Sequence, residues 1–196
     1  MSACGGRGPE HLVLASASPR RQYLLRSAGI GFEVVVPHDD EPDRLPDEDC
    51  EEYARRAATA KAQAVALRMP GRPVLGADTV VVLEGEVLGK PADADEAERM
   101  LRRLSGRTHR VCTGVALARG GADGNVAVTS LVVVTEVTFR ALGEGEIAAY
   151  VATGEPLDKA GAYGIQGLGG KLVAGYSGSF TNVVGLPMEA VERLLG

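Results

Sequence analysis

Cysteine and histidine are scarce in this chain of 196 residues, which contains three of each. The cysteines are widely spaced, at Cys4, Cys50 and Cys112. Because they are odd in number and form no Cys-x-x-Cys pair, they exclude a disulfide framework and a zinc knuckle and are typical of a reducing compartment. The histidines are equally scattered, at His11, His38 and His109. A metal site built from imidazoles is therefore not expected.

Long apolar runs and an excess of positive charge are also missing. No stretch approaches the ~20 apolar residues that a membrane-spanning helix needs, and residues 1–10 lack the apolar core of a signal peptide. The formal net charge of −5 argues against a nucleic-acid-binding face, although it leaves room for a local basic pocket. We therefore expect a soluble, cytoplasmic protein whose partners include neither a membrane nor a nucleic acid.

The order of the expected elements predicts an α/β fold with a loose tail over residues 1–10 and a single domain over residues 11–196. The expected strands are Leu12–Leu14, Phe32–Val36, Pro73–Leu83, Val87–Leu88, Thr108–Arg119, Val126–Arg140 and Lys171–Ala174. The expected helices run from Ser18-Pro19 to Ala28-Gly29, then over Asp49–Arg68, Asp93–Leu104, Glu144–Thr153 and Pro187–Leu195. The two long strands near the middle of the chain are expected to form a hairpin.

The first strand runs through small residues into Ser18-Pro19, where a helix is expected to begin. Serine is a favoured N-cap, and proline is tolerated at the first helical position. Arg20 and Arg21 then fall in the first turn, at the end of a helix that favours anions. Free helical N–H groups beside two guanidinium groups suit phosphate oxygens. The alternative is a solvated arginine pair at the start of a surface helix.

Asp78 is the strongest local anomaly, because it lies inside the apolar run Val74–Val82. Aspartate is disfavoured in strands, and a buried carboxylate is costly unless it is paired or bound to a metal. A functional carboxylate is therefore favoured over a structural one that accepts backbone hydrogen bonds. Lys90 follows the return strand and places a cation near the same edge.

Two further charged side chains interrupt otherwise ordinary patterns. Lys61 falls on the apolar stripe of the expected helix Asp49–Arg68, so its ammonium either extends to water or points into a cleft. Glu41 lies in an acidic loop after a strand, where ligands commonly bind in α/β proteins. The alternative is that this loop is simply solvated.

The stretch Asp158–Gly170 is rich in glycine but lacks the spacing of a dinucleotide-binding fingerprint. We expect a loop that packs closely against another part of the chain, with the amide of Gln166 able to recognise a ligand edge. The alternative is that Gln166 only braces its own loop. Taken by charge, the cations Arg20, Lys61 and Lys90 and the candidate carboxylates suit the hydrolysis of a phosphoanhydride with a divalent ion.

Six motifs carry a resemblance to a known family, in the order Ser16-Ala-Ser-Pro-Arg-Arg21, Gly76-Ala-Asp-Thr79, Gly89-Lys-Pro91, Leu104-Ser-Gly-Arg-Thr108, Asp158-Lys-Ala-Gly-Ala-Tyr-Gly-Ile-Gln-Gly167 and Val183-Val-Gly-Leu-Pro187. From about Leu12 to its C-terminus the chain resembles the Maf family of nucleoside triphosphate pyrophosphatases. Tyr163-Gly-Ile-Gln166 is similar to the branch that cleaves dTTP and UTP rather than the branch that acts on 7-methyl-GTP. The resemblance implies an elongated, twisted mixed sheet with flanking helices and a central cleft between two lobes.

The resemblance also implies roles for the residues. Asp78 would be the proton acceptor or would hold a metal-bound water. Positions tied to substrate choice or binding would be Arg20, Thr79, Gln166, Ser16, Arg21, Lys61 and Lys90. Glu41 and Asp78 would hold Mg²⁺ or Mn²⁺, with Asp39 or Asp40 as replacements for Glu41 in that variable loop.

The activity implied is water attack on a pyrimidine nucleoside triphosphate, with the monophosphate and pyrophosphate as products. Two alternatives stay open: a nucleotide-binding regulator of septum formation without turnover, and a pyrophosphatase with another base preference. A homodimer is one option for the oligomeric state.

Overall fold

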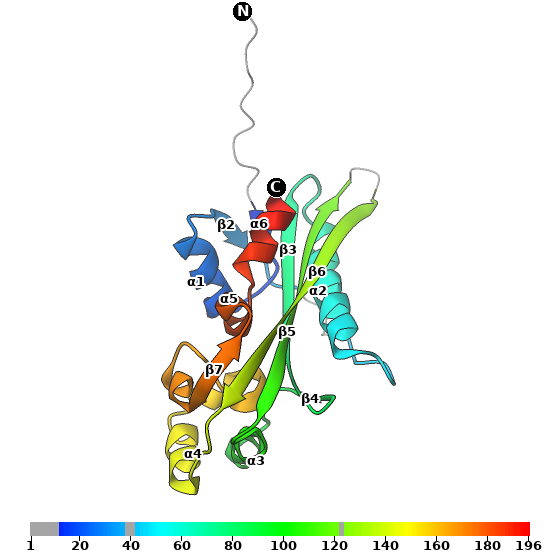
Figure 1. The fold of residues 1–196 in the computed structure, drawn as a ribbon. Helices are drawn as coiled ribbons and strands as arrows, with labels where there is room; N and C mark the ends of the chain where they lie inside the picture. Colours follow the sequence, from blue (N-terminus) through cyan, green and yellow to red (C-terminus); the bar gives the residue numbers. More distant parts are fainter. Residues whose placement is uncertain (1–11, 38–41, 122–123) are drawn as a thin grey trace, which may run out of the picture.

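A twisted seven-stranded mixed sheet forms the long axis of the molecule in the computed structural model, which describes residues 12–37, 42–121 and 124–196 (Figure 1). The strand order is β2-β1-β3-β5-β6-β7, and β4 pairs with β3. The strands are β1 (Leu12–Leu14), β2 (Phe32–Val34), β3 (Pro73–Leu83), β4 (Glu86–Leu88), β5 (Thr108–Gly120), β6 (Val126–Phe139) and β7 (Val173–Ser177). The predicted α/β class with a mixed sheet is confirmed.

Helices pack along the sheet and at its lower end (Figure 1). The α-helices are α1 (Pro19–Ser27), α2 (Cys50–Ala66), α3 (Ala94–Leu104), α4 (Glu144–Val151), α5 (Phe180–Val184) and α6 (Met188–Leu195). Three 3₁₀ turns are η1 (Glu155–Asp158), η2 (Ala160–Ala162) and η3 (Leu168–Leu172). Within the described residues, no helix has both the length and the apolarity needed to cross a bilayer.

Several expected boundaries were wrong. β2 ends at Val34 rather than Val36, although the N–H of Val35 still donates to Leu14 O at 3.1 Å. The last strand starts at Val173 and continues to Ser177, because Lys171 and Leu172 belong to a 3₁₀ turn. Helix α5 was missed, since five residues are too few to show a helical period. The predicted tail, residues 1–10, lies outside the described residues.

The centre of the sheet is β3, whose two edges are paired differently. On one edge β5 runs antiparallel to it from Pro73 to Val82. On the other edge β1 pairs in parallel as far as Leu75, and β4 pairs antiparallel from Val81. Between those two points, over residues 76–80, no strand of the described chain covers this edge of β3. This gap in the middle of the sheet gives ligands access to β3.

Helix α2 lies unusually close to the sheet because glycines face alanines across the contact. A Cβ atom added at Gly114 would lie 2.1 Å from the carbonyl oxygen of Ala54, and one at Gly76 would lie 2.4 Å from that of Ala58. Both alanines are fully buried. Side chains larger than hydrogen at these glycines would force α2 away from β3 and β5.

Two apolar cores lie at the two ends of β3. The first lobe packs α1 and α6 on one end of the sheet, around residues such as Leu14, Leu25 and Leu186. The second lobe packs α3 and α4 on the other end, around Leu101 and Ile147. β3 and β5 are long enough for one face of each strand to contribute side chains to both cores: Leu75 and Ala77 pack in the first lobe, and Val81 and Leu83 pack in the second.

Candidate active site

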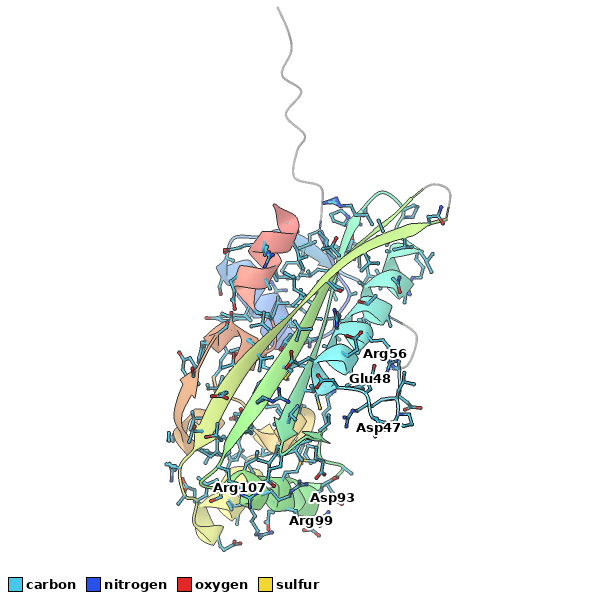
Figure 2. All side chains as sticks on the ribbon, turned by 45° about the vertical axis from the view of Figure 1, so that its right-hand side comes forward. Asp47, Glu48, Arg56, Asp93, Arg99 and Arg107 are labelled. Atoms are coloured by element: carbon cyan, nitrogen blue, oxygen red, sulfur yellow. The ribbon has the colours of Figure 1, made fainter. Side chains whose placement is uncertain are left out.

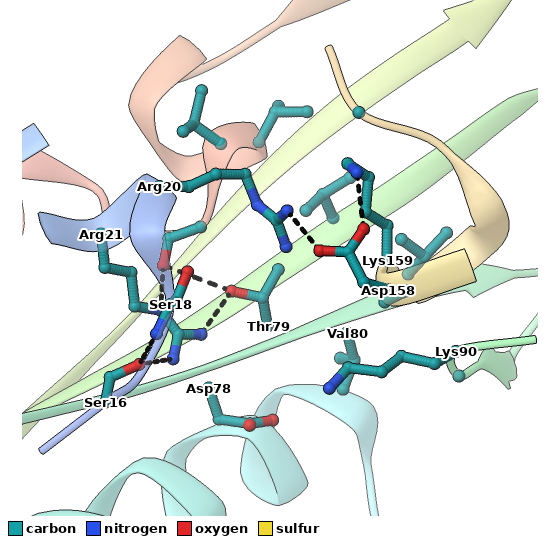
Figure 3. A pocket seen from close by; sticks show the side chains of 18 of the residues that line it. Ser16, Ser18, Arg20, Arg21, Asp78, Thr79, Val80, Lys90, Asp158 and Lys159 are labelled. Atoms are coloured by element: carbon teal, nitrogen blue, oxygen red, sulfur yellow. Dashed lines mark hydrogen bonds and ion pairs between the residues drawn. The ribbon is translucent and has the colours of Figure 1, made fainter. Parts of the chain in front are cut away.

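A cavity of about 1010 Å³ lies beside the gap in the β3 edge, with walls from both lobes. Its lining includes eight of the nine predicted site residues, namely Ser16, Arg20, Arg21, Lys61, Asp78, Thr79, Lys90 and Gln166. Figure 3 shows how several of these side chains point toward a common space. Glu41, with Asp39 and Asp40, lies outside the described residues. The predicted central cleft is therefore present, and the sequence named most of its polar lining.

Asp78 occupies the middle of β3 and faces α2 (Figure 3). It is only 4% exposed, and its Oδ1 forms an ion pair with the ammonium of Lys61. This pairing decides between the two options for Lys61: its charge points into the cleft. The residue opposite Asp78 in β5 is Gly114, where α2 approaches most closely, so the short distance between helix and strand brings Lys61 to the carboxylate.

Thr79 points to the opposite face of β3 and meets Arg21 from the first turn of α1. The guanidinium donates to Thr79 Oγ1 at 3.3 Å, to Ser16 Oγ at 3.1 Å and to the carbonyl of Gly185 at 2.9 Å. Ser18 holds the N-cap position, but its side chain makes no capping hydrogen bond. Arg21 is thus not a solvated surface arginine; it joins α1, β3 and the end of α5.

A buried polar network of Thr113 and Asn182 holds the hydroxyl of Thr79 in place. Thr79 Oγ1 lies 3.0 Å from the hydroxyl of Thr113, which donates to the carbonyl of Asn182 at 3.2 Å. Thr113 and Asn182 are fully buried, and Asn182 belongs to α5, the helix missed from the sequence. A capping signal was available, because Ser179 Oγ accepts from the N–H of Asn182 and Gly185 ends the helix with positive φ.

Arg20 reaches across the cleft to the second lobe. Its Nη1 lies 3.0 Å from Asp158 Oδ2, and Asp158 also accepts from Lys159 Nζ at 2.6 Å (Figure 3). Partial burial acts to raise the pKa of Asp158, but the hydrogen bonds from Lys159 and Arg20 outweigh it and hold that pKa below its usual value. The sequence assigned no role to Asp158 or Lys159, although their motif was part of the family resemblance.

Lys90 and Gln166 complete the polar lining from the second lobe. Lys90 is exposed just after β4, and its side chain extends into the cleft past Val80 (Figure 3). Gln166 is also exposed on the glycine-rich stretch. In the described part of the chain, its amide makes no hydrogen bond to a neighbour.

A buried histidine supports the wall from which Gln166 projects. His109 is 2% exposed, and its Nε2 lies 2.8 Å from the hydroxyl of Tyr163, which lines the cavity. Burial lowers the pKa of His109 to about 4, so its ring is neutral at pH 7. Its hydrogen bond therefore fixes Tyr163 rather than adding charge to the site.

The cavity concentrates positive charge in an acidic protein. Five basic side chains line it, Arg20, Arg21, Lys61, Lys90 and Lys159, against the three carboxylates of Asp78, Glu155 and Asp158. The chain as a whole has a formal charge of −5. The local basic pocket allowed by the composition is present, and it suits a polyanionic ligand.

The oxygen donors of the cavity lining determine whether a divalent ion would fit there. Within residues 12–37, 42–121 and 124–196, no three His, Cys, Asp or Glu side chains come together to form a metal site. Mg²⁺ needs fewer protein ligands when substrate phosphates share its coordination, and one or two carboxylates then suffice. Asp78 supplies a hard carboxylate donor within the cavity lining, which fits such a phosphate-bound ion.

Comparison with known proteins gives consistent matches over nearly the whole chain. The profile of the family described as Maf-like protein matches residues 11–196. A dTTP/UTP pyrophosphatase of Symbiobacterium thermophilum is 54% identical over 186 residues, which are 95% of this chain and 93% of that protein. A dTTP/UTP pyrophosphatase of Nitratidesulfovibrio vulgaris is 53% identical over 94% of this chain and 86% of that protein. Among solved structures, a HAM1 protein from Coxiella burnetii is 18% identical, covers 94% of this chain and 96% of that one, and has a TM-score of 0.49.

Proposed function

The chain belongs to the Maf family, and from that premise we propose that it is a nucleoside triphosphate pyrophosphatase that hydrolyses dTTP and UTP. The products are the nucleoside monophosphate and pyrophosphate. One observation carries the proposal: a basic cavity gathers Asp78 and seven other predicted polar residues around the edge of β3 that no described strand covers. The names of the relatives support the choice of dTTP and UTP.

Asp78 is proposed as the general base. A carboxylate that is almost fully buried, as that of Asp78 is, can take the proton of a water molecule that attacks the α,β-phosphoanhydride. The ion pair with Lys61 holds the Asp78 carboxylate in place at the middle of β3. Because both groups sit on rigid elements, β3 and α2, the base needs little reorganisation when substrate binds.

Arg20, Lys90 and the start of α1 are proposed to bind the triphosphate. A guanidinium can fork onto two phosphate oxygens, and the free N–H groups of a helix start favour the same charge. The triphosphate would compete with Asp158 for Arg20, since that guanidinium is already paired across the cleft. Arg21 has a different proposed role: it holds Ser16 and Thr79 in position.

We propose Asp78 as a ligand of Mg²⁺ or Mn²⁺, together with Glu41 as expected from the sequence. When bound, such an ion would neutralise charge on the phosphate oxygens and lower the barrier to water attack. Its requirement is tested by measuring hydrolysis after chelation and after each ion is restored.

We propose that Gln166 selects the base of the nucleotide. Its amide offers a donor and an acceptor that match O4 and N3–H of uracil or thymine, whereas cytosine reverses both polarities. We therefore expect preference for dTTP and UTP over CTP, and Gln166→Ala should reduce it. Mispairing of a polar group that the bound base has buried costs about 1–3 kcal/mol. The measurement is kcat/KM for UTP and CTP in both proteins, and an unchanged ratio would remove Gln166 from base recognition.

A nucleotide panel tests the function itself. The protein is incubated with each nucleoside triphosphate and Mg²⁺, and pyrophosphate and orthophosphate are measured separately. Release of pyrophosphate from dTTP and UTP is expected, with Asp78→Asn as the inactive control. Tight nucleotide binding without pyrophosphate would instead favour a regulator that does not turn over its ligand. Rapid hydrolysis of 7-methyl-GTP alone would reassign the substrate.

The cytoplasm, where nucleoside triphosphates are made and used, is the proposed location of this activity. A homodimer and the lack of a nucleic-acid partner stay predictions, which light scattering and a nucleic-acid binding assay would test.

A further inference from the structure

The glycine loop, residues Gly164–Gly170, is folded around the side chain of Glu155. Glu155 Oε2 accepts from the N–H of Leu168 at 3.0 Å, and Oε1 accepts from the N–H of Gly169 at 3.1 Å. The hydroxyl of Tyr150 donates to Oε1 at 3.0 Å and accepts from the N–H of Gly164 at 3.2 Å. Both ends of the loop are thus tied to one carboxylate, directly or through one phenol.

The glycines allow this close approach. A Cβ atom added at Gly167 would lie 2.5 Å from Glu155 Oε1, and one at Gly169 would lie 2.5 Å from the Tyr150 hydroxyl. Neither position could hold a larger residue without moving the loop away from Glu155. The packing partner that the glycine-rich sequence led us to expect is therefore the Glu155 carboxylate with its Tyr150 neighbour.

The hydrogen bonds around Glu155 require its charged form. Partial burial acts to raise the pKa of Glu155, but the donors of Leu168, Gly169 and Tyr150 outweigh it and lower that pKa below its usual value. A carboxylate accepts on both oxygens, whereas an amide of the same shape can accept only on one. The loop geometry therefore depends on the ionised glutamate rather than on its size.

We propose that Glu155 is a positioning residue for base selection, which acts by holding the glycine loop so that Gln166 faces the base. Gln166 lies within this loop, between Gly164 and the two N–H donors, and its own amide has no hydrogen bond to described residues. Its direction therefore depends on the backbone that Glu155 fixes. This inference rests on the proposed function, since it concerns which triphosphate is preferred.

The test uses Glu155→Gln, with Glu144→Gln as its matched control. Glu144 is an exposed glutamate that pairs with Arg102, outside the cavity lining. In Glu155→Gln the ratio of kcat/KM for UTP to that for CTP should fall about tenfold, the effect of one lost hydrogen bond to a charged group. In the control the ratio should not change.

Two further measurements separate positioning from general damage. Amide hydrogen exchange at Leu168 and Gly169 should accelerate in Glu155→Gln, while the strands of the second lobe keep their protection. Adding Gln166→Ala to Glu155→Gln should lower the UTP/CTP ratio no further than Gln166→Ala alone, because residues that act through each other are not additive. Fully additive effects would overturn the proposal.

The outcomes distinguish this inference from the proposed function. If the native protein releases no pyrophosphate from UTP or dTTP, the proposed function fails, and with it the role of Glu155 in base selection. If the native protein prefers UTP and Glu155→Gln keeps that ratio although its loop exchanges faster, the inference alone is wrong. Should Glu155→Gln not fold, Tyr150→Phe removes one donor to the carboxylate and should lower the ratio about threefold, a smaller hydrogen-bond effect; an unchanged ratio there would also overturn the proposal.

Discussion

Asp78 and Thr79 are neighbours in β3, yet the two faces of the strand surround them differently. On the α2 face, Asp78 pairs with the ammonium of Lys61, where glycines bring the helix close to the sheet. On the other face, Thr79 joins a network of hydroxyl and carbonyl groups with one guanidinium, that of Arg21. Because side chains alternate along a strand, two adjacent residues can serve separate tasks in one cavity. This difference supports the proposal that the reaction takes place on the α2 face and that the Thr79 face positions the substrate.

The ion pair that joins Glu48 and Arg56 shows how the start of α2 is held. In Figure 2 these two residues lie together where the chain enters this helix. Arg56 Nε lies 2.7 Å from Glu48 Oε1, and its Nη2 donates to the carbonyl of Asp43 at 2.7 Å. The hydrogen bond from Arg56 lowers the pKa of Glu48 to about 2. Ion pairs therefore hold α2 at two places: Glu48 pairs with Arg56 near the start of the helix, and Asp78 pairs with Lys61 in the cavity.

The largest effect is expected from Asp78→Asn. The amide keeps the shape of the side chain but cannot take a proton, so kcat should fall at least ~10²-fold, the contribution of one general base. Pyrophosphate release from UTP measures this, with circular dichroism to establish that the variant is folded. Near-native turnover in a folded Asp78→Asn protein would move the reaction away from the α2 face.

A second substitution tests whether the close packing of α2 against the sheet keeps Lys61 beside Asp78. Gly114→Ala places a methyl group against the backbone of Ala54, so the helix must shift, and the free energy of unfolding should fall by about 3 kcal/mol. The shift would also separate Lys61 from Asp78 and reduce kcat.

The control for that change is Gly145→Ala in α4, where an added Cβ meets nothing within 4 Å. Alanine is the better helix former, so this variant should gain up to about 1 kcal/mol. Urea denaturation measures both proteins. Equal stability of Gly114→Ala and native protein would show that α2 does not depend on this contact.

A smaller effect is expected on the Thr79 side from Arg20→Lys. An ammonium cannot fork onto two phosphate oxygens, so kcat/KM should fall about tenfold, and Arg20→Ala should lower it further. Asp158→Asn removes the competing carboxylate and should leave phosphate binding by Arg20 intact. If Arg20→Ala hydrolysed UTP normally, the start of α1 would not be a phosphate site.

The parts of the fold with a strong period or a clear anomaly could be predicted from the sequence. The apolar strand with Asp78 and the alanine-rich helix with Lys61 are long enough for their patterns to be visible. Helix α5 is five residues long, so only its caps mark it. Its Gly185 carbonyl nevertheless accepts from Arg21, a contact between residues 164 positions apart that no local pattern reveals.

Contacts that leave no local sequence pattern also limited the prediction of the site. Arg20, Thr79 and Gln166 were named from their motifs, and they line the cavity. Glu155 was not named from the sequence. Its partners in the loop are the backbone N–H groups of Leu168 and Gly169, and every residue except proline carries such a group. The glycines indicated that something packs closely against the loop, but sequence spacing cannot say which side chain does so.

The two long central strands have a consequence for how the molecule unfolds. Since β3 and β5 carry side chains of both cores, neither lobe can lose its strands without opening the other. The lobes should therefore melt in one cooperative transition rather than one after the other. A nucleotide held between them would raise the stability of the whole chain, and the rise in melting temperature would report its affinity.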